Sequence, residues 1–91
     1  MVRKRLTFEG RVQGVGFRYR AYYAAQELRL TGWVKNQWDG SVVMEVQGSE
    51  EKIDALISQI NNGRFVSISR IDSKSLPVDE EEKSFNIRHY D

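Results

Sequence analysis

The fold is decided by residues 6–28, LTFEGRVQGVGFRYRAYYAAQEL, where the spacing of the apolar side chains changes. Leu6, Phe8 and Val12 recur at even positions, which is the period of a strand with one buried face. Beyond the glycines of the stretch, the apolar residues follow helical spacing instead, at Phe17, Ala21, Ala24, Ala25 and Leu28. The stretch therefore predicts a strand that runs through a glycine-containing loop into a helix of about three turns.

Two strands joined by a tight turn are predicted after this helix, which we expect to end before Thr31-Gly32. Residues 33–38 predict the second strand, and the alternating apolar residues of 42–46 predict the third. Asp39-Gly40 lies between them and predicts a two-residue type I′ hairpin, because both residue types tolerate the positive φ that this turn needs.

A second helix follows the third strand. Ser49 and the acidic residues after it suit a helix N-terminus, where a side-chain oxygen caps the backbone and negative charge meets the positive end of the helix dipole. The apolar stripe of this helix consists of Ile53, Leu56, Ile57 and Ile60. We expect Gly63 to end the helix in the left-handed conformation.

The C-terminal part of the chain adds two strands. Val66 and Ile68 predict a fourth strand, with a bulge or its end near Ser69-Arg70, where Ile71 falls out of phase. Phe85 and Ile87 predict a short last strand. Residues 76–83, which include the acidic run 79–82, read as an exposed, solvated loop. The element order predicts an α+β fold: a ferredoxin-like βαββαβ sandwich with a mostly antiparallel four- or five-stranded sheet and two helices on one face.

Composition narrows the class of protein. A chain of 91 residues holds one hydrophobic core, so we expect one domain over residues 1–91. The absence of Cys excludes disulfides, thiolate metal sites and a cysteine nucleophile, and a single His89 cannot build a histidine metal cluster, although a Ser-His-Asp triad stays formally open. A net charge of +1 falls short of a dedicated nucleic-acid binder, and no apolar run suits a membrane span or a signal peptide. We therefore expect a cytoplasmic protein with no nucleic-acid or membrane partner.

The loop between the first strand and the first helix is the best candidate for a binding site. Gly14 and Gly16 allow the backbone N–H groups to point into one concavity at a helix N-terminus, which suits a tetrahedral anion, and Arg18 can present a fork of donors to two phosphate oxygens. Alternatively, the glycines form only a tight turn and Arg18 is a solvated surface residue. ATP-binding and dinucleotide-binding motifs do not fit, because Phe17-Arg18-Tyr19 stands where they need Lys-Ser/Thr or Gly.

Two motifs make the sequence similar to a known family. The segment GRVQGVGFR at 10–18, followed by GWVKN at 32–36 and DGSV at 39–42, resembles the acylphosphatases, and the likeness continues through 46–48 and 84–88. The resemblance implies the ferredoxin-like fold and the hydrolysis of the carboxyl-phosphate bond of small acyl phosphates to a carboxylate and inorganic phosphate. It also implies no metal or other cofactor and, as is usual in the family, a monomer.

The resemblance also implies the roles of individual residues. The arginine that closes the first motif corresponds to Arg18, which binds the phosphate, and the asparagine of the second corresponds to Asn36, which holds the attacking water. The substrate-binding loop consists of Gln13, Gly14, Val15, Gly16, Phe17 and Arg18. Residues 61–65 replace a Pro-containing loop that is frequent in the family, and His89 interrupts its usual Arg-Tyr ending.

Other interpretations remain open at this point. Asn36 by itself is an ordinary polar residue for the solvent face of a strand. We interpret Trp33 and Trp38 as packing residues, with the alternative that one of them lines the pocket for the acyl group. Acylphosphatase-like domains also occur within larger proteins such as hydrogenase maturation factors, where the loop would bind an anion without turnover. An RNA-binding sheet is disfavoured, because Val15 stands where a stacking aromatic residue is needed.

Overall fold

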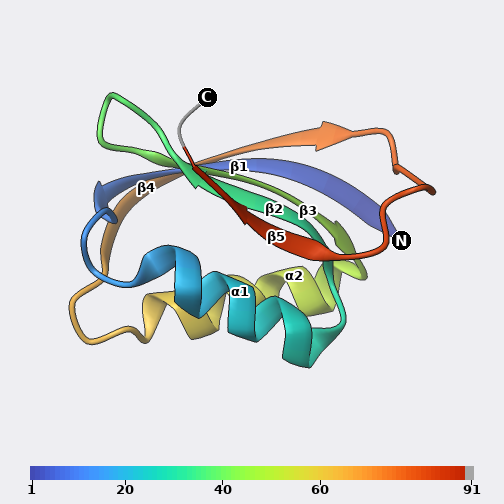
Figure 1. Ribbon diagram of the computed structural model, residues 1–91, viewed down its shortest axis with the longest axis horizontal. Helices are drawn as coiled ribbons and strands as arrows, with labels where there is room; N and C mark the ends of the chain where they lie inside the picture. The colour runs from blue at the N-terminus through green and yellow to red at the C-terminus, as the bar shows by residue number, and fades with distance from the viewer. Residues whose placement is uncertain (90–91) are drawn as a thin grey trace.

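The computed structural model describes residues 1–89 and has a five-stranded sheet with two helices on one face (Figure 1). Its elements are β1 (Val2–Arg11), α1 (Phe17–Leu28), β2 (Thr31–Asn36), β3 (Val42–Gly48), α2 (Glu50–Asn61), β4 (Ser67–Leu76) and β5 (Phe85–Arg88). The strand order is β4-β1-β3-β2-β5, and all neighbours pair antiparallel except β2 and β5, which pair parallel. The ferredoxin-like prediction is confirmed.

The hydrophobic core lies between the helices and one face of the sheet. α1 packs against β2 and β5, and α2 packs against α1 and β3. The fully buried side chains include Leu6, Phe8, Phe17, Val34, Met44, Ile53, Leu56, Ile60 and Phe85. Burying each large apolar side chain contributes about 1.5–3 kcal/mol, so the periodic apolar stripes identified in the sequence are what hold the two layers together.

The connection between β2 and β3 differs from the predicted turn. β2 ends at Asn36 rather than reaching Trp38, and the N–H of Gln37 donates to the carbonyl of Ser41 at 2.8 Å. Gly40 has a φ of 93°, but Asp39 does not have positive φ, so the type I′ prediction was wrong. The reason is that the Asp39 carboxylate accepts hydrogen bonds from the N–H (2.9 Å) and the hydroxyl (2.6 Å) of Ser41, which favours a longer loop over 37–41.

Gly63 does not end α2 in the left-handed conformation, so this prediction was also wrong. The C-cap of α2 is Asn62, with a φ of −79°, and Gly63 has no positive φ. A Cβ atom at Gly63 would lie 2.8 Å from Nε of Arg20 and 2.9 Å from Cγ2 of Val66. A side chain at this position would therefore require Arg20 and Val66 to shift, whereas the φ of Gly63 does not itself require glycine.

The predicted irregularity in the fourth strand is confirmed as a bulge. Glu9 pairs with Arg70 whereas Gly10 pairs with Ile68, so Ser69 is an additional residue on β4. The strand does not end there but continues to Leu76 along β1. The bulge explains why the apolar positions change phase near this point.

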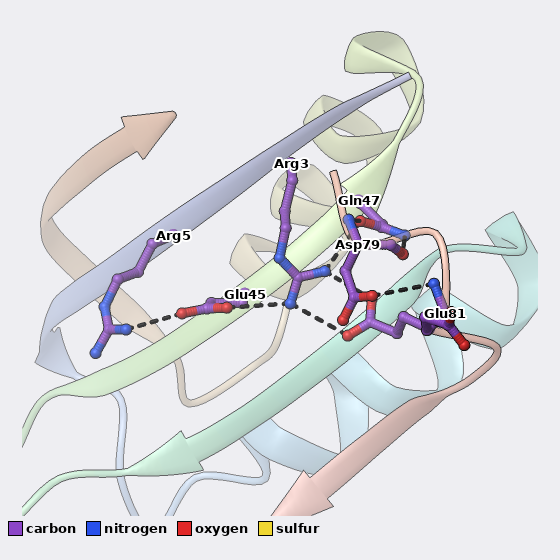
Figure 2. Close-up of polar contacts among 7 residues, drawn as sticks. Arg3, Arg5, Glu45, Gln47, Asp79 and Glu81 are labelled. Carbon is purple, nitrogen blue, oxygen red and sulfur yellow. Dashed lines mark hydrogen bonds and ion pairs between the residues drawn. The ribbon is translucent and has the colours of Figure 1, made fainter. Parts of the chain in front are cut away.

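The acidic run at 79–82 is only partly a solvated loop. Figure 2 shows the buried guanidinium of Arg3 in a network of polar side chains on the open face of the sheet. Arg3 donates to Glu82 at 2.8 Å, to Glu45 at 3.0 Å and to Gln47 at 3.0 Å. The Gln47 amide in turn donates to the Asp79 carbonyl at 2.8 Å and accepts from the Asp79 N–H at 2.9 Å. The prediction of a solvated segment was therefore wrong at Glu82, whose hydrogen bond raises the pKa of Arg3 above its ordinary value.

Candidate active site

The loop between β1 and α1 has the backbone conformation expected of an anion cradle. Gly14 and Gly16 have φ values of 72° and 81°, and Gly16 is the N-cap of α1 without a side chain that could cap the helix. In the described part of the chain, the backbone N–H groups from Gly14 to Tyr19 donate no hydrogen bond; the first main-chain bond of α1 runs from Arg20 to Gly16. The first turn of α1 also carries no acidic residue, so no carboxylate within that turn meets these donors or the positive end of the helix dipole.

The side chains of the loop have separate tasks. Phe17 is buried and packs edge-on against Phe8, with ring centroids 4.9 Å apart, while Val15 is half-buried against the core. These two residues anchor the loop through their side chains and leave their N–H groups for the cradle. Apolar packing against the hydrophobic core therefore fixes the loop.

Arg18 lies in the first turn of α1 and is half-buried. Its guanidinium makes no hydrogen bond or ion pair with any residue from 1 to 89. A guanidinium without a carboxylate partner has donors available for an anion. Arg18 as a whole residue is neither buried nor fully exposed.

Asn36 is the last residue of β2 and shares the face of the sheet on which Val34 is buried. This is the face that α1 covers, and α1 begins at the end of the sheet where β2 ends (Figure 1). The Oδ1 atom of Asn36 is buried and has no hydrogen-bond partner within residues 1–89. Buried acceptors in folded proteins are nearly always hydrogen-bonded, so this oxygen has capacity for a hydrogen bond from water or a ligand.

Gln13 connects the cradle to the loop that follows Asn36. Its Nε2 atom donates to the carbonyl of Gln37 at 2.7 Å and to the carbonyl of Ser41 at 2.8 Å. The sequence placed Gln13 in the binding loop but gave no indication of this contact. The acceptors are main-chain carbonyls, which every residue has, so no sequence pattern reveals them.

The aromatic residues near the site separate into buried and exposed groups. Trp33 is 8% exposed beneath the cations of Arg5, Lys35 and Arg88, of which Arg88 is closest at 4.5 Å from the ring centroid. Trp38 is 81% exposed, so the prediction that it is a packing residue was wrong. It lies in the loop between β2 and β3.

The described residues provide neither a metal-binding cluster nor a membrane-spanning helix. Among residues 1–89, no three His, Asp or Glu side chains gather in a way that could hold a metal ion, and no helix is long and apolar enough to cross a membrane. His89, the base of the formally open triad, lies exposed just after β5.

Comparison with known proteins identifies the family. The family model described as acylphosphatase matches residues 4–87. The acylphosphatase of Clostridium beijerinckii is 46% identical over 90 residues, covering 98% of this chain and 100% of that protein. The crystal structure of acylphosphatase from Bacillus subtilis is similar with a TM-score of 0.87 and 35% identity, covering 97% of this chain and 99% of that one.

A larger protein contains a similar fold. The crystal structure of full-length HypF in a phosphate- and nucleotide-bound form is similar with a TM-score of 0.81 and 31% identity, covering 96% of this chain but 12% of that one. The family match nevertheless covers most of the sequence, and the Clostridium and Bacillus proteins are matched over nearly their whole length. The chain therefore belongs to the acylphosphatase family of enzymes.

Proposed function

We propose that this enzyme hydrolyses the carboxyl-phosphate bond of small acyl phosphates, with the phosphoryl group held by the N–H groups of residues 13–18 and by Arg18. One observation carries the proposal. Within residues 1–89, neither the backbone N–H groups from Gly14 to Tyr19 nor the guanidinium of Arg18 in the same segment makes a hydrogen bond or ion pair. Phosphoryl transfer passes through a loose transition state with charge on the equatorial oxygens, so catalysis is mainly positioning and electrostatic stabilisation. Oriented amides and a guanidinium supply that stabilisation.

Asn36 is the residue that we assign to the attacking water. An amide cannot take up a proton at neutral pH, but its buried Oδ1 can accept a hydrogen bond from water and hold the water in line with the scissile bond. The water oxygen forms a bond to phosphorus while the bond from phosphorus to the carboxyl oxygen breaks. The carboxylate leaves unprotonated, and the proton of the water passes to the phosphate product.

The test is hydrolysis of a simple aryl or alkyl acyl phosphate in excess chelator. We expect turnover, because a chain without Cys and with a single His lacks the usual ligands of a catalytic zinc site, and a carboxylate leaving group needs no Lewis acid. A phosphate monoester is the control and should be a poor substrate, since its alkoxide leaving group requires protonation. Loss of turnover in chelator that Mg²⁺ restores would contradict the metal-free reaction.

Two further properties follow from the proposal and have simple tests. A monomer is expected in size-exclusion chromatography, as the resemblance to the acylphosphatases implies. Binding of inorganic phosphate without any turnover of acyl phosphate would instead indicate an anion-binding module, the alternative function raised by the sequence.

A further inference from the structure

The two parts of the proposed site lie on separate elements. The amide cradle and Arg18 belong to the β1–α1 connection, whereas Asn36 ends β2. In-line attack requires that the phosphoryl group and the water keep a fixed relative position, and a displacement of about 1 Å can reduce the rate by about 10²-fold. Some contact must therefore hold the two loops together at this end of the sheet.

Gln13 provides that contact. It precedes Gly14, so it begins the cradle, and both of its bonds from Nε2 reach the loop that begins directly after Asn36. The acceptors, the carbonyls of Gln37 and Ser41, are the two ends of that loop. The loop itself is closed by the bond from the Gln37 N–H to the Ser41 carbonyl at 2.8 Å and by the bonds from Ser41 to Asp39.

We propose that the Gln13 side chain is a positioning residue, which fixes the cradle relative to Asn36 and so aligns the water with the bound phosphoryl group. The inference rests on the proposed function and adds a role for the side chain of a residue assigned there only through its backbone. One terminal nitrogen with two N–H donors satisfies both carbonyls at once. Anion binding needs only the cradle, so loss of the contact impairs alignment rather than phosphate affinity.

The experiment compares three variants with the parent enzyme. Gln13→Met keeps the length of the side chain and removes its donors; Gln13→Glu presents a carboxylate to two carbonyl oxygens. Gln26→Met is the matched control, because Gln26 is an exposed residue of α1. For each protein, kcat on an acyl phosphate, the Kd of inorganic phosphate and the urea midpoint are measured.

For Gln13→Met we expect kcat to fall by about 10²-fold with the phosphate Kd within about threefold of the parent, and no change for Gln26→Met. Gln13→Glu should recover activity relative to the parent as the pH falls toward the usual glutamate pKa of about 4.3, because a protonated carboxyl group again donates one hydrogen bond. At that pH Gln13→Glu should be more active than Gln13→Met, because removal of a charge near phosphate would by itself raise Gln13→Glu only to the activity of the neutral variant without donors.

Three results would overturn the positioning role: a parent-like kcat in Gln13→Met, a loss of phosphate affinity parallel to the loss of kcat, or no recovery of Gln13→Glu on acidification. If Gln13→Met fails to fold, the acid recovery of Gln13→Glu decides the question, with its folded fraction measured at each pH. If the parent enzyme itself does not turn over acyl phosphates, the proposed function fails instead, and the two failures are thus distinguishable.

Discussion

Two arginines near opposite ends of the sheet have opposite environments. Arg3 is buried near the start of β1, and Arg18 is half-buried in the first turn of α1, which follows the other end of that strand. The guanidinium of Arg3 is 6% exposed and contacts Glu82, Glu45 and Gln47 (Figure 2). Arg18 makes no hydrogen bond or ion pair with any residue from 1 to 89, and the N–H groups of the loop before it also lack acceptors there. A buried charge with partners is part of the folded structure, whereas the donors of Arg18 remain available to the phosphoryl group that we propose as its ligand.

The largest expected effect tests the Arg18 side of this comparison. Arg18→Gln should reduce turnover by about 10²–10³-fold, because it removes a preorganised donor to the transferring phosphoryl group. Affinity for inorganic phosphate should weaken as well. Arg18→Lys should retain only part of the parent's turnover and phosphate affinity, since Lys cannot bind two oxygens as a fork. Calorimetric titration of phosphate is the measurement; parent-like binding by Arg18→Gln would remove Arg18 from the cradle.

Arg3→Met should produce the converse result, a loss of stability without a loss of activity. Removing one partner of a buried pair leaves uncompensated charge, and we expect the free energy of unfolding to fall by about 3 kcal/mol. The measurement is urea unfolding together with kcat on an acyl phosphate.

The double variant Arg3→Met/Glu82→Met sharpens this test. Replacing both members of a buried pair by apolar residues is less costly than removing one, so the double variant should be more stable than Arg3→Met. A strong loss of kcat in folded Arg3→Met would show that the two ends of β1 are coupled and would break the comparison.

Asn36→Ala should lower kcat by about 10²-fold while phosphate affinity is retained, because the donors to the anion lie on residues 13–18. The Oδ1 atom has no partner among residues 1–89, so its removal should change the free energy of unfolding by no more than about 1 kcal/mol. The check is kcat, phosphate Kd and urea midpoint side by side. An unaltered kcat would exclude Asn36 from the mechanism, and a collapsed urea midpoint would assign it to structure.

The smallest expected effect concerns the loop over 37–41, to which the Gln13 side chain donates its hydrogen bonds. The hydroxyl of Ser41 and then its N–H lower the pKa of Asp39 below its ordinary value of 3.8. Because the folded-state pKa is the lower one, the carboxylate adds stability above about pH 3.8, and this contribution is lost as the pH falls through the folded pKa.

The variant Asp39→Asn should therefore show a slightly shallower decline of the urea midpoint with acid than the parent. The measurement is a series of urea titrations between about pH 5 and about pH 2. Identical slopes in the two proteins would mean that the Asp39 carboxylate does not support the loop.

The element order was predictable because it depends on local patterns. The change of period within residues 6–28 predicted β1 and α1. Gly14 and Gly16 predicted a curled loop between them, and both glycines have positive φ. The Arg3 network was not predictable, because Glu82 lies 79 residues away along the chain.

The errors in the turns have a similar origin. Asp39-Gly40 is a good type I′ sequence, but the competing bonds from Ser41 to the Asp39 carboxylate decide the conformation. Gly63 suits a left-handed C-cap equally well, yet α2 ends at Asn62 without positive φ, and Gly63 lies where Arg20 and Val66 come close. In the first case a neighbouring side chain outweighs the intrinsic preference of the backbone.

The contrast between the two tryptophans gives the protein two optical signals. Trp33 is 8% exposed and sits within the sheet, whereas Trp38 is 81% exposed and belongs to the loop after Asn36. Indole emission shifts to longer wavelength in contact with water, and soluble quenchers reach exposed rings first. The short-wavelength component therefore follows the integrity of the sheet, and the quenchable component follows the loop that Gln13 holds against the cradle.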